Sequence, residues 1–249
     1  MPDYSANPAN IEHLLDKLGI PAPPAVQRSR ALLTAVGELD VVNRPPLSNA
    51  QLASRALAML RDGQDVDLVA LVSENAALGV TGEADRLLRA VQSDAEIAHE
   101  QAIRGAARGL LPDVRTETEK VIEQVRRLPQ GTPTRSEAAV DGGQAAVMAY
   151  QALKVLGERH GQLRALHAEL VAGTVDMTAF AWYRDTKCQP TFATGRAETA
   201  GPSEPLARLR WLTTPEAQAW VPSGPECTSH YLAISQERNK PRTPATVQA

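Results

Sequence analysis

Two long segments with helical periodicity, joined by a short turn, constrain this fold more than any other feature of the sequence. Within residues 81–128, small apolar side chains recur at alternating spacings of three and four residues, which is typical of a helix with one buried seam. Residues 136–171 carry a second seam with the same spacing. The intervening residues 129–133 are bounded by two prolines and have the length of a helix–helix connection. The sequence therefore predicts a long antiparallel helical hairpin over residues 80–172.

The seam of the second helix combines leucines with two histidines. Protonation of these histidines at about pH 6 would place charge inside the seam, so one interpretation is a pH-sensitive helix interface. The other interpretation is that the imidazoles flank the seam and form hydrogen bonds, while leucines fill the core. We expect Leu156, Leu163 and Leu170 to be buried along one face. The full predicted seam is Leu153, Leu156, His160, Leu163, His167 and Leu170.

Proline and glycine residues indicate where these helices bend or weaken. Pro112 lacks a backbone donor and its ring clashes with the preceding turn, so we expect a kink or short break at Leu111–Pro112. In the second helix, Gly142 and Gly143 form a weak point, because each glycine costs about 1 kcal/mol relative to alanine.

Residues 1–79 are predicted to form smaller N-terminal helices separated by helix breakers. One of these helices covers residues 49–61. Asp65 or Asp67 is a candidate N-cap for the last helix of the region, because a carboxylate oxygen can accept hydrogen bonds from the first backbone amides of a helix. We expect that helix to end at Gly79.

The composition changes near Gly173. Seven of the nine aromatic residues follow this point. We predict that residues 173–237 form an irregular aromatic- and proline-rich module, with short strands at residues 180–183 and 230–234. Residues 238–249 are expected to form a basic tail. The predicted fold class is therefore mainly α, with the hairpin between smaller N-terminal helices and this C-terminal module.

Charge and hydropathy exclude several classes of protein. The formal net charge is −3, and the only basic cluster is the short C-terminal tail, so nucleic acid is not an expected partner. No basic and apolar N-terminal signal is visible, and no apolar stretch reaches the length of a membrane span. With two cysteines, the chain has no disulfide framework. We expect a cytoplasmic protein or a part of an assembled particle.

Two groups of residues are candidate metal ligands. Glu96 and His99 are three positions apart on a helix, the spacing that di-iron bundles use in pairs, but only one such pair occurs here. Cys188, Cys227 and His230 would supply three ligands of a structural zinc site, and a fourth ligand is missing. We therefore predict no cofactor, and keep zinc as the alternative.

The sequence lacks the glycine-rich nucleotide-binding motifs, the His-Glu-x-x-His metalloprotease motif and the Gly-x-Ser-x-Gly hydrolase motif, which favours a non-enzymatic role. We predict a structural or interaction protein, a helical scaffold or assembly component such as those of a phage particle or another multi-subunit machine. Its partners would be other protein subunits, identical or different. The alternatives are a helical metal-binding protein or enzyme, and a nucleic-acid-associated helical protein. Large aromatics anchor interfaces, so the candidate contact residues are Trp182, Trp211 and Trp220.

Overall fold

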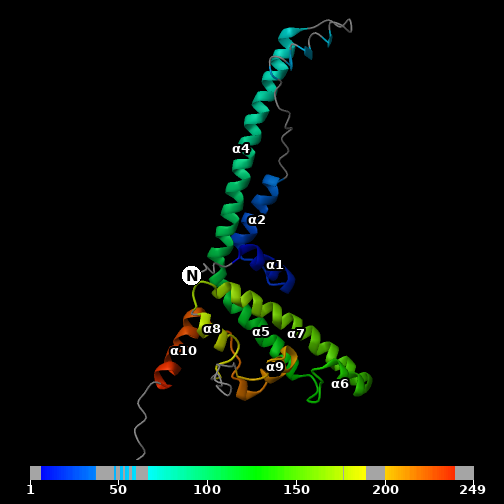
Figure 1. The fold of residues 1–249 in the computed structure, drawn as a ribbon, viewed down its shortest axis with the longest axis vertical. Helices are drawn as coiled ribbons and strands as arrows, with labels where there is room; N and C mark the ends of the chain where they lie inside the picture. Colours follow the sequence, from blue (N-terminus) through cyan, green and yellow to red (C-terminus); the bar gives the residue numbers. More distant parts are fainter. Residues whose placement is uncertain are drawn as a thin grey trace, which may run out of the picture. The chain divides into compact units, whose positions relative to one another are not determined.

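The computed structural model describes residues 7–37, 67–175, 177–188 and 200–238, with a few positions between 48 and 59. Over this part the chain is mainly helical and has no strand, which confirms the predicted mainly α class (Figure 1). In chain order the elements are α1 (Pro8–Leu18), α2 (Pro24–Gly37), α4 (Leu68–Ala107), η1 (Arg108–Leu110), α5 (Leu111–Arg126), α6 (Ser136–Asp141), α7 (Gly143–Val171), α8 (Met177–Tyr183), α9 (Pro205–Trp211), η2 (Pro215–Ala217) and α10 (Gly224–Arg238).

The chain divides into two compact units. The main unit comprises Met1–Pro23 and Ile103–Ala249, and the second unit comprises Pro24–Ala102. The boundaries expected from composition, after residues 79, 172 and 237, stay predictions. Most of the predicted helix at residues 49–61 and all of the basic tail beyond Arg238 lie outside the described residues.

Local side-chain chemistry sets the ends of α1 and the start of α4. The side chain of Asn7 caps α1, and Gly19 ends it in the left-handed conformation that glycine adopts without steric cost. The Asp67 carboxylate accepts a hydrogen bond from the amide of Ala70, at 3.0 Å, and so caps α4. The predicted end at Gly79 is wrong, because α4 continues through this residue. An isolated glycine is tolerated inside a helix.

The predicted break near Pro112 is confirmed. The α4 helix gives way to the 3-10 turn η1, and α5 begins at Leu111 with Pro112 in its first turn. A proline at that position loses nothing, because the first amides of a helix have no intrahelical acceptor. The second predicted helix also has a break. At Gly142 and Gly143 it divides into α6 and α7, and Gly143 has a φ of 79°.

The core of the main unit forms where α1, α5 and α9 pack on α7 (Figure 1). At Gly157 a terminal methyl group of Leu206 approaches so closely that an added Cβ would lie 2.4 Å from it, so α9 packs closely on α7 at this glycine. Fully buried side chains in the core of the main unit include Ile11, Leu15, Val114, Val121, Val125, Leu153, Leu163 and Leu166.

The hairpin predicted over residues 80–172 stays a prediction in its full length, because residues up to Ala102 belong to the second unit.

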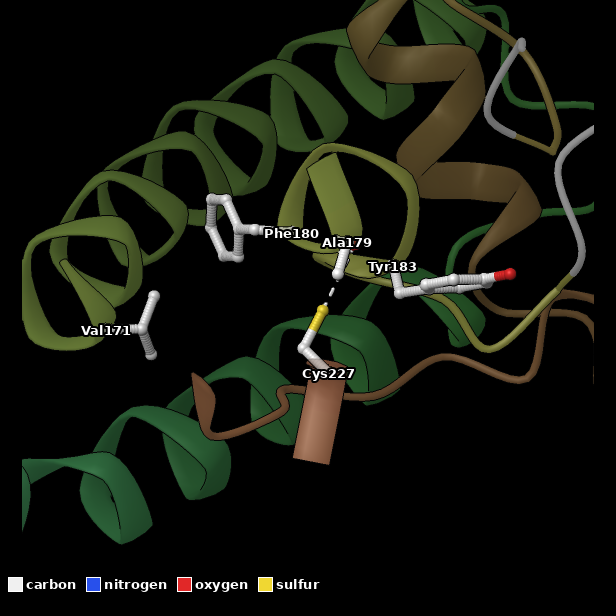
Figure 2. Close-up of a cluster of buried hydrophobic side chains, with 5 residues drawn as sticks. All are labelled: Val171, Ala179, Phe180, Tyr183 and Cys227. Carbon is white, nitrogen blue, oxygen red and sulfur yellow. Dashed lines mark hydrogen bonds between the residues drawn. The ribbon is translucent and has the colours of Figure 1, made fainter. Parts of the chain in front are cut away.

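The short strands predicted in the C-terminal module are wrong. Residues 180–183 lie in α8 and residues 230–234 lie in α10. Short apolar runs fit a buried helix as well as a strand, and here the runs pack against the end of α7. Figure 2 shows the resulting cluster of Val171, Ala179, Phe180, Tyr183 and Cys227.

Of the helices that the structure describes, none combines the length and apolar character needed to cross a bilayer.

Candidate functional site

The three tryptophans are each partly buried by residues of their own chain. Trp182 lies edge-on to Tyr231, with ring centroids 5.1 Å apart. The indole nitrogen of Trp220 donates a hydrogen bond to the carbonyl of Tyr183 at 2.7 Å, and its ring contacts His230. The Trp211 ring closes over Gly201, so closely that a Cβ there would lie 2.4 Å from it. Part of each ring remains exposed, and a contact with another subunit stays a prediction.

The candidate zinc ligands each bind a backbone carbonyl instead of converging. The Cys188 thiol contacts the carbonyl of Glu216 at 2.8 Å, and the buried Cys227 thiol donates to the carbonyl of Ala179 at 3.2 Å (Figure 2). His230 binds the carbonyl of Lys187 at 3.0 Å. Among the described residues, no group of three or more His, Cys, Asp or Glu side chains could hold a metal ion.

Glu96 and His99 in α4 also have different environments. Glu96 is exposed, whereas His99 is buried and its Nδ1 lies 2.8 Å from the hydroxyl of Ser29 on α2. This hydrogen bond gives the Nδ1 atom of the buried His99 a polar partner, so its burial does not require a metal ion.

The predicted seam of α7 is mostly buried. Leu153, Leu163 and Leu170 are buried, whereas Leu156 is only partly buried. Both seam histidines are buried as well, with 6% of His160 and 2% of His167 exposed. These imidazoles line a cleft that the sequence did not reveal.

This cleft has a volume of about 370 Å³ and is formed by α7, α8 and α9 of the main unit. Helix α7 contributes one wall through residues spaced three and four apart, which share a face. Phe180 of α8 and Pro205 of α9 contribute apolar surface. The polar lining residues are His160, Arg164 and His167 of α7, Arg184, which follows α8, and Arg208 of α9.

A buried ion pair at Asp185 organises the cleft. The Arg208 guanidinium binds this carboxylate with two hydrogen bonds, from Nε at 2.8 Å and from Nη2 at 2.5 Å. Arg164 approaches the same carboxylate, with Nη1 3.0 Å from Oδ2. Asp185 and Arg208 are only 5% and 6% exposed, so their charges compensate each other away from solvent.

Backbone interactions hold the ion pair in place. An isolated bridge pairs Thr186 with Ala219, and the amide of Trp220 donates to the carbonyl of Asp185 at 3.2 Å. The remaining nitrogen of Arg208, Nη1, donates to the carbonyl of Ala200 at 3.0 Å. All donor nitrogens of Arg208 are therefore engaged by the protein.

The two histidines of the cleft are neutral at physiological pH. The pKa of His160 is lowered to about 4, chiefly by burial; the nearby charge of Asp185 opposes this shift, and those of Arg208 and Arg184 add to it. Burial also lowers the pKa of His167. The Nε2 atom of His167 lies 2.6 Å from the carbonyl of Pro222, so this nitrogen carries the proton. In contrast, His160 forms no hydrogen bond with any residue that the structure describes.

The cleft is consequently positive. Its three guanidinium groups face one carboxylate, that of Asp185, and the imidazoles add no charge. Arg184 is exposed and forms no ion pair or hydrogen bond within the described part of the chain. Arg164 uses one of its five N–H donors in the ion pair, so donors on two arginines remain for a ligand.

Sequence reasoning missed the three charged residues that build the cleft. Arg164, Asp185 and Arg208 belong to no local motif, and only tertiary contacts bring them together. One sequence signal could have indicated that Arg164 lies beside the two histidines. Arg164 is four residues from His160 and three from His167, so the three side chains share one helix face. No protein family, curated protein or solved structure matches this chain.

Proposed function

We propose that this chain is a structural or interaction protein, a helical scaffold that associates with a second copy of itself through the N-terminal half of α7. The observation that carries the proposal is a row of exposed apolar side chains. Met148 and Val155 are each 64% exposed, and Ala145 and Ala152 are exposed between and before them. The spacing of three, four and three residues is that of a helix seam that packs against a partner helix.

The flanks of this row favour a second copy as the partner. Gln144 and Gln151 lie along one side, and Ala149 and Leu156 lie along the other. Because these flanking positions carry no charge, pairing with an identical helix brings no like charges together. The two alanines of the row allow close approach of the helix backbones. The row covers only about two heptads, so we expect weak, concentration-dependent association rather than an obligate dimer.

The aromatic module supplies a second candidate contact. Trp182 and Trp220 pack on the cluster of Figure 2 and remain partly exposed, as expected of interface anchors. A larger assembly would use this surface together with α7. This part of the proposal predicts that Trp182→Ala lowers the mass of the assembly while the helix content is unchanged.

The direct test is the molar mass in solution as a function of protein concentration, measured by light scattering. We expect the mass of the wild type to rise above 26.7 kDa with concentration. Met148→Glu and Val155→Glu should each keep the protein monomeric, because they place charge in the row. Leu87→Glu is the matched control, since Leu87 is 68% exposed on a helix outside the main unit. A monomeric wild type at all concentrations, or equal loss in the control, would refute self-association through α7.

A further inference from the structure

We propose that the cleft between α7, α8 and α9 binds the phosphate group of a small organic phosphate monoester, through Arg164, Arg184 and His160. This site is separate from the exposed row on α7, and its test does not depend on self-association. The cleft of about 370 Å³ lies within the usual size range of small-molecule sites.

The first argument is the buried and unengaged imidazole of His160. Only 6% of this residue is exposed, and it forms no hydrogen bond with the described residues although it lines the cleft. Among the described residues, the buried side-chain atoms that lack a hydrogen-bond partner are Tyr183 Oη and Thr214 Oγ1, so the ring of His160 is open to the cleft rather than sealed from it. A ligand oxygen in the cleft would accept the N–H of this neutral imidazole.

The second argument is the charge of the cleft. Arg208 is fully engaged by Asp185 and by backbone carbonyls, whereas Arg164 and Arg184 have donors available. The three guanidinium groups exceed the single carboxylate by two positive charges. A phosphate monoester carries about −1.5 to −2 at neutral pH, so it matches this excess better than a single carboxylate does. Two guanidinium groups also provide the planar, multiple donors that phosphate oxygens accept.

The third argument is the shape and lining of the cleft. Gly161 lines it without a side chain, and a Cβ built at this position would meet no other atom within 4 Å. Ala165, Ala168 and Phe180 supply apolar surface beside the arginines. The arrangement therefore fits a ligand with a compact organic body attached to the phosphate, rather than a long polyanion.

The test is calorimetric titration of the full chain with phenyl phosphate, benzoate and phenol. These three probes share one apolar body and differ in the charge of the head group. We expect phenyl phosphate to bind at least about tenfold more tightly than benzoate, because its second charge and third oxygen engage the second arginine. Phenol should show no measurable binding. Equal affinity for phenyl phosphate and benzoate, or no heat with phenyl phosphate, would overturn the assignment.

Variants localise the binding. Arg184→Gln should weaken the binding of phenyl phosphate about tenfold. Arg127→Gln, which removes another exposed arginine charge at the end of α5, should change that binding less than about twofold. Gly161→Leu fills the cleft and keeps every charge, so it should abolish the binding of phenyl phosphate. If the Arg127 variant lost as much affinity as the Arg184 variant, the binding would be non-specific. If a variant did not fold, the comparison of probes on the wild type would still decide.

Discussion

The two halves of α7 depart from the usual pattern of a globular helix in opposite directions. The first half exposes apolar side chains, with Met148 and Val155 each 64% exposed. The second half buries polar ones, with His160 and His167 at 6% and 2%. Exposed apolar patches and buried polar groups are the informative exceptions in a protein, because each costs stability that a partner or ligand can recover. The contrast teaches that one helix carries both candidate functions, an association surface at one end and a ligand cleft at the other.

The most disruptive test of the cleft beside the second half of α7 removes Asp185, the carboxylate that pairs with Arg164 and Arg208. Asp185→Ala leaves the Arg208 guanidinium buried without its carboxylate, and we expect a loss of about 3–5 kcal/mol in the free energy of unfolding. Asp141→Ala, at an exposed position in α6, should change it by less than about 0.5 kcal/mol. Chemical denaturation of the two variants checks this. A loss at Asp185 no larger than that at Asp141 would show that the ion pair contributes nothing to the fold.

A matched pair of apolar truncations on α7 compares the two halves directly. Leu163 is 1% exposed, so Leu163→Ala should destabilise the protein by about 2–5 kcal/mol through lost burial and the cavity left behind. Val155 is 64% exposed, and Val155→Ala should change the free energy of unfolding of the monomer by less than about 0.5 kcal/mol. The measurement is denaturant unfolding at low protein concentration. Similar effects at both positions would erase the distinction between the halves.

The buried histidines predict a specific dependence on pH. The pKa of His160 is lowered to about 4 in the folded chain, so only the unfolded chain takes up this proton between about pH 6.5 and pH 4. Stability should therefore fall as the pH falls through that window, by up to about 3 kcal/mol for this residue. His160→Gln should reduce the slope of stability against pH there. An unchanged slope would mean that His160 is not held neutral by burial.

Several elements of the fold could be predicted from local sequence because their causes are local. Pro112 sets the start of α5, Gly143 divides α6 from α7, and Gly19 ends α1. Each acts through its own backbone geometry, so the surrounding structure is not needed to predict its effect. The periodicity of residues 136–171 likewise indicated a helix in which Leu153 and Leu163 are buried.

Other features were decided only by tertiary contacts. The segments around Phe180 and Tyr231 have apolar runs too short to distinguish strand from helix, and packing against the end of α7 gave them a helical conformation.

The cleft depends still more on tertiary structure. Asp185 and Arg208 are 23 positions apart, and Arg164 is on another helix, so no spacing rule relates them. The sequence determined by itself where several helices begin, break and end, as at Gly19, Pro112 and Gly143, because capping and backbone restrictions act over a few residues. Only the tertiary structure decided which charges meet and which face of α7 stays exposed, because both follow from the packing of segments distant in sequence.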